Sequence, residues 1–339
     1  MATSPSHTNN PSDTTPASRT ISRRSLLTGS VLAAGAASGV LGQHEAAAGV
    51  DWNAAPSAGA IPRRQPIGVS TYSFWQFKPD QKLSIEECIQ KSSAYGFDGV
   101  EILHRQMTDE SPAGIRSIKQ CALKEGMPLF GLSTHQTFVS PKPEVRRKNI
   151  DHTIHCLQLA HDLGIPTIRV NTGTWGTRKD FDDLMAHRGI EEVLEGHTED
   201  EGFQWVNDSF AECVVAAEKL GVVMGLENHW GLGRTATGVL RVIKAVNSPW
   251  LKATVDTGNF LDDQYTQFEQ LLPQAVLIQA KTYYGGGNWY TLDLDYKKYA
   301  QLIQTAGYRG YVSLEFEGKA PAAIAIPQSL AMLRSAFAG

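Results

Sequence analysis

Carboxylate side chains stand at the ends of three short apolar runs of the chain. Glu227 closes Val-Met-Gly-Leu-Glu, Asp256 closes Ala-Thr-Val-Asp, and Glu315 closes Val-Ser-Leu-Glu. A carboxylate in an apolar strand is costly unless it is paired or binds a metal ion. A single case would indicate a structural ion pair with a neighbouring Lys or Arg. Three equivalent cases indicate a shared polar site.

An amide side chain joins this set, because Gln279 stands in a fourth apolar run, Val-Leu-Ile-Gln-Ala-Lys. Three carboxylates and an amide oxygen form an all-oxygen donor set, which hard cations prefer. We therefore predict a bound divalent metal ion, with Mn²⁺ or Mg²⁺ ahead of Zn²⁺. The predicted ligands are Glu227, Asp256, Gln279 and Glu315.

Glu227 and Glu315 are also the candidate acid/base pair. Two opposed glutamates, one on each side of a bound sugar, could remove a proton from one face of a carbon atom and return it to the other face. A metal ion would polarise the adjacent carbonyl group and stabilise the enediolate. This chemistry isomerises or epimerises sugars and needs no organic cofactor.

Further polar residues near strand ends are predicted to contact the substrate. Side chains alternate along a strand, so His229 shares the side of Glu227, and Lys281 shares that of Gln279. The structural alternatives are a loop histidine at 229 and a rim lysine paired with a carboxylate at 281. Asn259 could equally cap the following helix. The predicted substrate contacts are Glu101, His135, Asn171, His229, Asn259 and Lys281.

Short β-rich runs alternate with longer helical patterns, which predicts a parallel sheet built from βα units. Eight such runs match a (β/α)₈ TIM barrel, in which active sites lie at the C-terminal ends of the strands. A doubly wound open sheet is the alternative, but no G-x-G-x-x-G turn follows the first run, where the sequence is Ser-Thr-Tyr-Ser-Phe-Trp. The predicted strands are 67–71, 99–102, 129–133, 167–171, 222–227, 252–256, 276–281 and 311–316.

Two connections between the predicted strands and helices are expected to contribute to the site. About 35 residues separate Asn171 from a helix predicted to start near Asn207, and a barrel loop of that size is typical of an active-site lid. Its acidic run at 199–201 is interpreted as solvated surface. The glycines at 285–287 beside Trp289 do not lead into a helix, so they predict an aromatic-rimmed loop for stacking sugar rings instead of a phosphate cradle.

The cysteines and several histidines receive no functional role. No short ligand spacing joins the cysteines, which lie in predicted helices among apolar residues, so we expect buried free thiols instead of disulfides or a zinc site. His104 and His135 are the weaker histidine candidates, with a structural role as the alternative. The residues without a role are Cys88, Cys121, Cys156, Cys213, His152, His155 and His161.

The N-terminal region differs from the rest of the chain. Residues 1–20 are mostly Ser, Thr, Pro and Asn, which cannot bury enough apolar surface to become ordered. Three features predict a twin-arginine (Tat) export signal: the pair Arg23-Arg24, a weakly apolar run at 31–41 and Ala-Ala-Ala at 46–48. A transmembrane anchor is the alternative, but the apolar run is too short to span a membrane. We predict a disordered region and signal at 1–48, a linker at 49–65 and a barrel domain at 66–339. We therefore predict that the protein is exported to the periplasm and has no membrane anchor.

The whole chain of 339 residues has a net charge of −4 and a pI near 6.2. This balance argues against nucleic acid or an anionic membrane as a partner. The predicted partners are a small carbohydrate substrate and the twin-arginine export machinery, and an oligomer is left open.

Five motifs together resemble the sugar phosphate isomerase/epimerase family, the xylose isomerase-like barrels that include ketose 3-epimerases. They are Gly-Phe-Asp-Gly-Val-Glu at 96–101, Gly-Leu-Glu-Asn-His-Trp-Gly at 225–231, Val-Asp-Thr-Gly-Asn at 255–259, Ile-Gln-Ala-Lys at 278–281 and Val-Ser-Leu-Glu-Phe-Glu-Gly at 312–318. The resemblance implies that Glu227 and Glu315 bind the metal and form the acid/base pair, with Asp256 as a further ligand.

The chain departs from that family at two positions, because Gln279 and Asn259 stand where histidines are common. The same superfamily includes endonucleases whose trinuclear zinc site is built from several histidines. Gln279 and Asn259 occupy two of those histidine positions, and the chain is acidic, so DNA repair is not expected.

These observations predict an exported, metal-dependent isomerase or epimerase. Sugar phosphates are intracellular, and few basic residues besides Lys281 and Lys319 stand near the ends of the last two strands. The predicted substrate is therefore an unphosphorylated sugar or sugar derivative. Two alternatives remain: a lyase that performs β-elimination on 3-keto-glycosides at the same metal site, and a non-catalytic sugar-binding barrel.

Overall fold

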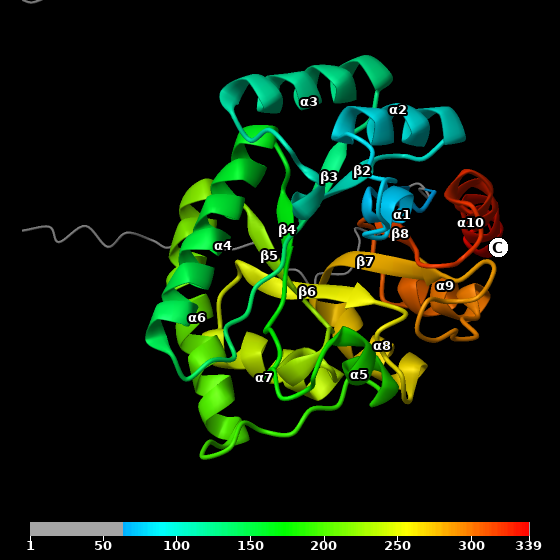
Figure 1. Cartoon of the computed structure of the whole chain (residues 1–339). Helices are drawn as coiled ribbons and strands as arrows, with labels where there is room; N and C mark the ends of the chain where they lie inside the picture. Colours follow the sequence, from blue (N-terminus) through cyan, green and yellow to red (C-terminus); the bar gives the residue numbers. More distant parts are fainter. Residues whose placement is uncertain (1–63, 339) are drawn as a thin grey trace, which may run out of the picture. The chain divides into compact units, whose positions relative to one another are not determined.

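Eight parallel strands pair in chain order, and β8 pairs with β1, so that the sheet closes into a barrel (Figure 1). The computed structural model describes residues 64–338. The predicted (β/α)₈ barrel is confirmed, and the pairing of Ile67 with Val312 excludes an open sheet. The strands are β1 (Ile67–Ser70), β2 (Val100–Leu103), β3 (Leu129–Ser133), β4 (Thr167–Val170), β5 (Val223–Glu227), β6 (Leu251–Asp256), β7 (Ala275–Thr282) and β8 (Val312–Phe316).

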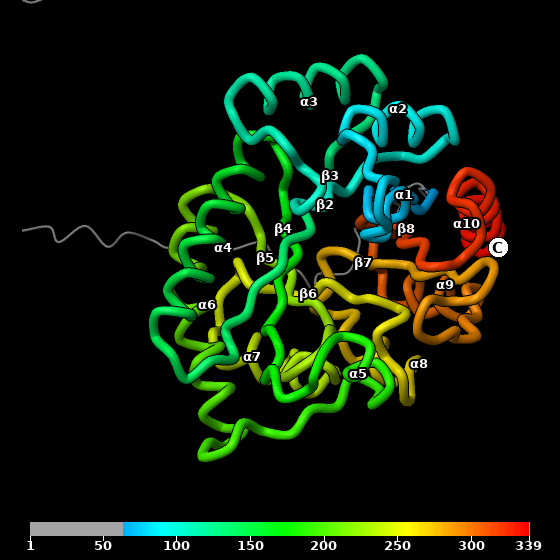
Figure 2. The backbone as a smooth tube through the Cα atoms, in the orientation of Figure 1, coloured from blue at the N-terminus to red at the C-terminus, as the bar shows by residue number. Residues whose placement is uncertain are grey.

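The helices cover the outside of this barrel (Figure 1). Helices α4 and α6 pack side by side along it, as the backbone trace in Figure 2 also shows. The predicted export signal at 1–48 and the linker up to residue 63 lie outside the described residues. The helices are α1 (Tyr72–Trp75), α2 (Ile85–Tyr95), α3 (Pro112–Glu125), α4 (Pro143–Leu163), α5 (Phe181–Ala186), α6 (Glu199–Leu220), α7 (Ala236–Val246), α8 (Gln264–Leu271), α9 (Tyr296–Thr305) and α10 (Ala322–Ala336).

The strands are buried because helices pack on one side of the sheet and the barrel interior lies on the other. Every residue of β2, β4 and β5 is buried, as expected for parallel strands. Helices α4 and α6 end at Gly164 and Gly221, whose φ values of 77° and 67° lie in the left-handed region that glycine adopts without strain. The following strands start within three residues of these glycines, which fixes the short αβ turns.

The register of the strands places the candidate residues at neighbouring positions near the C-terminal ends of β5 to β8. Asp256 on β6 pairs with Gln279 on β7, and Lys281 on β7 pairs with Glu315 on β8. Glu227 is the last residue of β5. The candidate residues therefore gather at the C-terminal end of the barrel, where active sites of this fold lie.

The prediction of a helix starting near Asn207 is wrong, because α6 starts at Glu199. Thr198 caps this helix: its hydroxyl accepts a hydrogen bond from the Glu201 N–H, and the Glu201 carboxylate accepts one from the Thr198 N–H. The exposed acidic run at 199–201 forms the first turn, where the helix dipole favours negative charge. The run is solvated, as predicted, and it also starts the helix.

Substitution of the cap, Thr198→Ala, is expected to lower the free energy of unfolding by about 1 kcal/mol, because one backbone N–H loses its acceptor. Urea unfolding monitored by circular dichroism measures the change. The control is Thr305→Ala at the exposed end of α9, which we expect to change stability by less than about 0.5 kcal/mol. Equal losses in both variants would contradict the capping role.

None of the four cysteines forms a disulfide, as expected, and the expected absence of a zinc site is not tested. Cys88, Cys156 and Cys213 are buried, whereas Cys121 is only half-buried. Among the described helices, none combines the length and the apolar character that a bilayer span requires.

Candidate functional site

A cavity of about 560 Å³ lies at the C-terminal end of the barrel. Its volume is in the range of small-molecule sites. Five predicted site residues line it: His135, Glu227, His229, Lys281 and Glu315. The other lining residues are Tyr72, Gln76, Phe77, Leu103, Arg105, Arg169, Phe181, Trp289 and Glu317.

Lys281 supplies a positive charge to three carboxylates of this site. Its Nζ lies 3.2 Å from Glu315 Oε2 and 3.5 Å from both Asp256 Oδ2 and Glu317 Oε2. Burial disfavours the charge, but the three carboxylates outweigh burial and hold the pKa of Lys281 well above its ordinary value. Lys281 is therefore a charged ammonium that both lines the cavity and pairs with carboxylates.

Glu227 is held by a guanidinium and two amides. Arg169 Nε lies 3.3 Å from Glu227 Oε2, to which Asn171 Nδ2 donates at 2.7 Å, and Asn259 Nδ2 donates to Glu227 Oε1 at 3.2 Å. Burial raises the pKa of Glu227, Arg169 opposes the rise, and the charge of Glu315 adds to it. The carboxylate is thus fixed in place in a setting that favours accepting a proton.

Asn171 and Asn259 do not line the cavity, although both are predicted substrate contacts. Both side chains donate hydrogen bonds to Glu227, and their contact with the substrate stays a prediction. The capping alternative for Asn259 is wrong, since Asp263 is the N-cap residue of α8.

Glu101 lies beneath the cavity and is fully buried. The hydroxyls of Ser133 and Ser313 donate to its carboxyl group, and Gln279 Nε2 donates to Glu101 Oε1 at 2.8 Å and to Glu315 Oε1 at 3.1 Å. Burial, followed by the charge of Glu315, raises the pKa of Glu101 to about 7. Glu101 does not line the cavity and accepts a hydrogen bond from Gln279, so its contact with the substrate stays a prediction.

One predicted metal ligand keeps an unsatisfied oxygen atom. Gln279 Oε1 is buried and has no hydrogen-bond partner, whereas the buried Asp256 Oδ2 has no hydrogen bond but forms an ion pair with Lys281 Nζ at 3.5 Å. Such atoms are costly unless a ligand satisfies them. The carboxylates of the site also outnumber the cations Lys281 and Arg169. The donor chemistry therefore fits a hard divalent cation.

The carboxylates of the site lie against two cations and do not form a compact group of ligand atoms. Some groups of three His, Cys, Asp or Glu side chains in the described part of the chain have ligand atoms within 4.8 Å of one another. None of these groups includes Glu227, Asp256 or Glu315. Lys281 and Arg169 instead stand against them, at 3.2 Å from Glu315 and 3.3 Å from Glu227.

Aromatic side chains from two connections form part of the cavity wall. Phe181 on α5 meets Trp289 edge-to-face with 4.8 Å between ring centroids, and Trp289 Nε1 donates to Asp182 Oδ1 at 2.7 Å. Phe77 contributes a third ring, 6.4 Å from that of His135. The segment predicted as a lid and the predicted aromatic loop therefore meet each other and both contact the cavity.

Five polar residues of the cavity wall are not among the predicted site residues: Tyr72, Gln76, Arg105, Arg169 and Glu317. Arg169 had a signal, because an Arg inside the run Thr-Ile-Arg-Val is as costly in a strand as a carboxylate. Tyr72 directly follows the first strand, and its hydroxyl donates to Glu317 Oε1 at 2.8 Å. This hydrogen bond joins a residue just after β1 to a residue just after β8, which are far apart in the sequence. No local sequence pattern predicts it.

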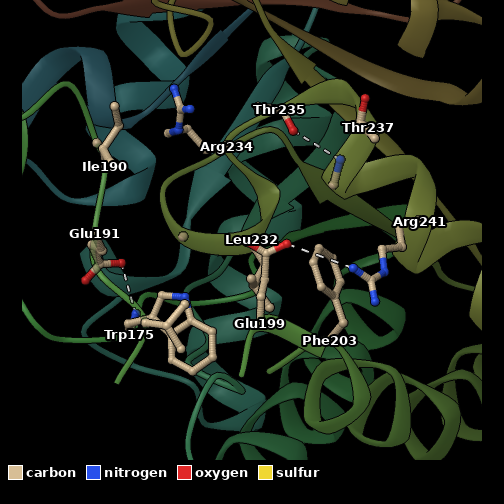
Figure 3. Close-up of a pocket in the computed structure, with 14 residues that line it drawn as sticks. Trp175, Ile190, Glu191, Glu199, Phe203, Leu232, Arg234, Thr235, Thr237 and Arg241 are labelled. Atoms are coloured by element: carbon tan, nitrogen blue, oxygen red, sulfur yellow. Dashed lines mark hydrogen bonds and ion pairs between the residues drawn. The ribbon is translucent and has the colours of Figure 1, made fainter. Parts of the chain in front are cut away.

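A second, smaller cavity of about 290 Å³ lies beside the start of α7 (Figure 3). Its acidic residues are already engaged: Glu191 accepts from the Trp175 N–H, and Glu199 faces Arg241. None of the strand-end carboxylates lines it. The central cavity is therefore the candidate active site.

A family profile described as xylose isomerase-like TIM barrel matches residues 89–336. The chain belongs to this family. The match includes β2 to β8 and all four predicted metal ligands, so the strand-end site lies within the part that defines the family. No protein in a curated sequence set matches the chain.

Several solved structures show the same fold. A 3-keto-D-glucoside 4-epimerase from E. coli is 19% identical over 80% of this chain and 100% of its own, with a TM-score of 0.64. An L-ribulose 3-epimerase is 16% identical over 80% and 95%, with a TM-score of 0.62. The probable 3-DHS dehydratase AsbF from Bacillus anthracis is 18% identical over 78% and 98%, with a TM-score of 0.60.

Proposed function

We propose that this family member is a divalent-metal-dependent isomerase or epimerase acting on an unphosphorylated sugar or sugar derivative. The observation that carries the proposal is the pair of buried glutamates on the cavity wall, each facing its own cation. Arg169 stands against Glu227, and Lys281 stands against Glu315. Two such carboxylates can remove a proton from a carbon next to a carbonyl group and return it. Solved structures with this fold include named sugar epimerases, which supports the proposal.

The metal ion would be held by Glu227, Asp256, Gln279 and Glu315. When bound, it supplies a Lewis acid that stabilises negative charge on the substrate oxygen. The protein contributes the rest. Glu227 and Glu315 hold and move the proton, and the Lys281 ammonium donates toward the developing oxyanion.

Two neutral imidazoles are available to the hydroxyl groups of a sugar. Burial lowers the pKa of both His135 and His229 well below the ordinary value, with the charge of Arg169 as the second cause in each case. His135 Nδ1 is buried and has no hydrogen-bond partner. We propose that both side chains orient the substrate, since neutral histidine offers one donor and one acceptor.

The charges of the cavity favour an unphosphorylated substrate. Of the cations on its described wall, Arg169 and Lys281 are paired with carboxylates, which leaves Arg105. A phosphate group would also meet the carboxylates of Glu227, Glu315 and Glu317. The aromatic wall instead suits the apolar faces of a sugar ring.

A deuterium-exchange assay tests this function. The protein is loaded with Mn²⁺ and given free ketoses in D₂O, and deuterium next to the carbonyl group is followed by NMR. We expect exchange and a new epimer or isomer, both lost on addition of a chelator, and little turnover of the phosphate esters. Absence of exchange with every free sugar would contradict the proposal.

A lyase acting on 3-keto-glycosides is the second candidate. The cavity volume of about 560 Å³ favours it, because this volume holds a group larger than one sugar. The aromatic wall could contact the aglycone. One structure with this fold is a named dehydratase, and another is named for a 3-keto-glucoside. Release of the aglycone from a 3-keto-glycoside, without an epimer product, would select the lyase.

A further inference from the structure

A second cluster of metal-ligating side chains lies where the β2–α3 connection meets α4. His104 follows β2, and Glu110 stands shortly before α3. His152, His155 and Cys156 share one face of α4 through their helical spacing. None of these five residues lines the central cavity.

Three of these side chains already have nearly the spacing of metal ligands. Cys156 Sγ lies 3.9 Å from His104 Nδ1 and 3.7 Å from His152 Nε2, and the three ligand atoms lie within 4.8 Å of one another. A tetrahedral ion with bonds of about 2.0–2.3 Å separates its ligand atoms by about 3.3–3.6 Å. Small side-chain rotations would close that difference.

Glu110 stands behind His104 as an orienting carboxylate. Its Oε1 lies 2.8 Å from His104 Nε2, and its Oε2 lies 2.6 Å from His155 Nε2. When His104 donates from Nε2, its neutral ring carries the lone pair on Nδ1, which is the nitrogen that faces Cys156. A carboxylate bonded to the far nitrogen of a metal-ligating histidine is the usual second layer of a zinc site.

Metal binding at this site requires the loss of one proton, because Cys156 is a buried free thiol. Binding forms a sulfur–metal bond and releases that proton to solvent, with no change of oxidation state.

We propose that Cys156, His104 and His152 bind a zinc ion, with water as the fourth ligand and Glu110 orienting His104. One thiolate and two imidazoles suit zinc better than the magnesium or manganese expected at the all-oxygen central site. The ion joins the β2–α3 connection to α4. It thereby fixes the backbone next to Arg105, whose side chain lines the central cavity. The spacing of His152 and Cys156 on α4 is visible in the sequence, but the third ligand, His104, comes from a different element.

Titration of the metal-free full chain with Co²⁺ tests this site. We expect a thiolate-to-cobalt charge-transfer band in the near ultraviolet, with an amplitude that corresponds to one thiolate-bound cobalt ion per chain, and loss of the band on addition of Zn²⁺. Cys156→Ser is expected to abolish the band. Glu110→Gln is expected to weaken cobalt binding by about 10–100-fold.

Matched controls separate this site from other effects. Cys213→Ser removes another buried thiol, on α6, and is expected to keep the band. Glu315→Gln alters only the sulfur-free central site and is also expected to keep it, so failure of the proposed sugar chemistry leaves this result unaffected. His152→Ala serves if Cys156→Ser does not fold. Absence of the band in the unmodified chain, or its persistence in Cys156→Ser or at full strength in His152→Ala, would overturn the proposal.

Discussion

Glu315→Gln is expected to lower kcat for deuterium exchange by about 10³-fold, within the range that a lost general acid or base costs. The amide keeps the shape of the carboxylate but cannot accept a proton. It also removes the nearest negative partner of Lys281, whose Nζ lies 3.2 Å from Glu315 Oε2. Initial rates of exchange with saturating sugar and Mn²⁺ measure the effect.

Two further variants make that result specific. Glu227→Gln is expected to lower the rate to a similar extent, because the proton must be handled on both faces of the substrate. Glu269→Gln, at an exposed position of α8, is the matched control and is expected to leave kcat unchanged. Near-normal exchange in both glutamate variants would contradict the assigned acid/base pair.

Much of the barrel could be predicted because its signals are local. A parallel strand buried on both sides reads as a short apolar run, and a glycine such as Gly164 marks the end of the preceding helix. The carboxylates Glu227, Asp256 and Glu315 could be identified as site candidates from their apolar runs alone, because a carboxylate is costly there whatever its partner is. The start of α6 was missed, because its signal is the pairing of Thr198 with Glu201 and not an apolar pattern.

The partners of each side chain could not be predicted in this way. Glu101 resembles the other strand-end carboxylates in sequence, yet it is buried under Gln279, whereas Glu315 reaches the cavity. Glu101 is the second residue of β2, whereas Glu315 is the fourth residue of β8 and lies nearer the C-terminal end of its strand. The same limit applies to His104, because its neighbours on α4 come from a helix that follows the next strand of the barrel.

Lys281→Met is expected to lower the free energy of unfolding by about 3–5 kcal/mol, the usual cost of leaving a buried charge without its partner. The methionine keeps much of the apolar stem but leaves Asp256, Glu315 and Glu317 without the ammonium that now lies within 3.5 Å of each. Urea unfolding of the metal-free chain measures the loss. Lys297→Met, at an exposed position of α9, is the matched control and should change stability by less than about 0.5 kcal/mol.

The cause of that loss can be separated from simple packing damage. If uncompensated charge is the reason, adding Glu317→Gln to Lys281→Met should recover part of the stability, although Glu317→Gln alone in the unmodified chain should destabilise it. A divalent ion at the central site should also recover part of the stability of Lys281→Met, since it replaces the missing positive charge. Mn²⁺ should therefore raise the unfolding midpoint of Lys281→Met more than that of the unmodified chain. Equal effects of Mn²⁺ on both proteins, together with no recovery in the double variant, would show that Lys281 contributes packing and not charge.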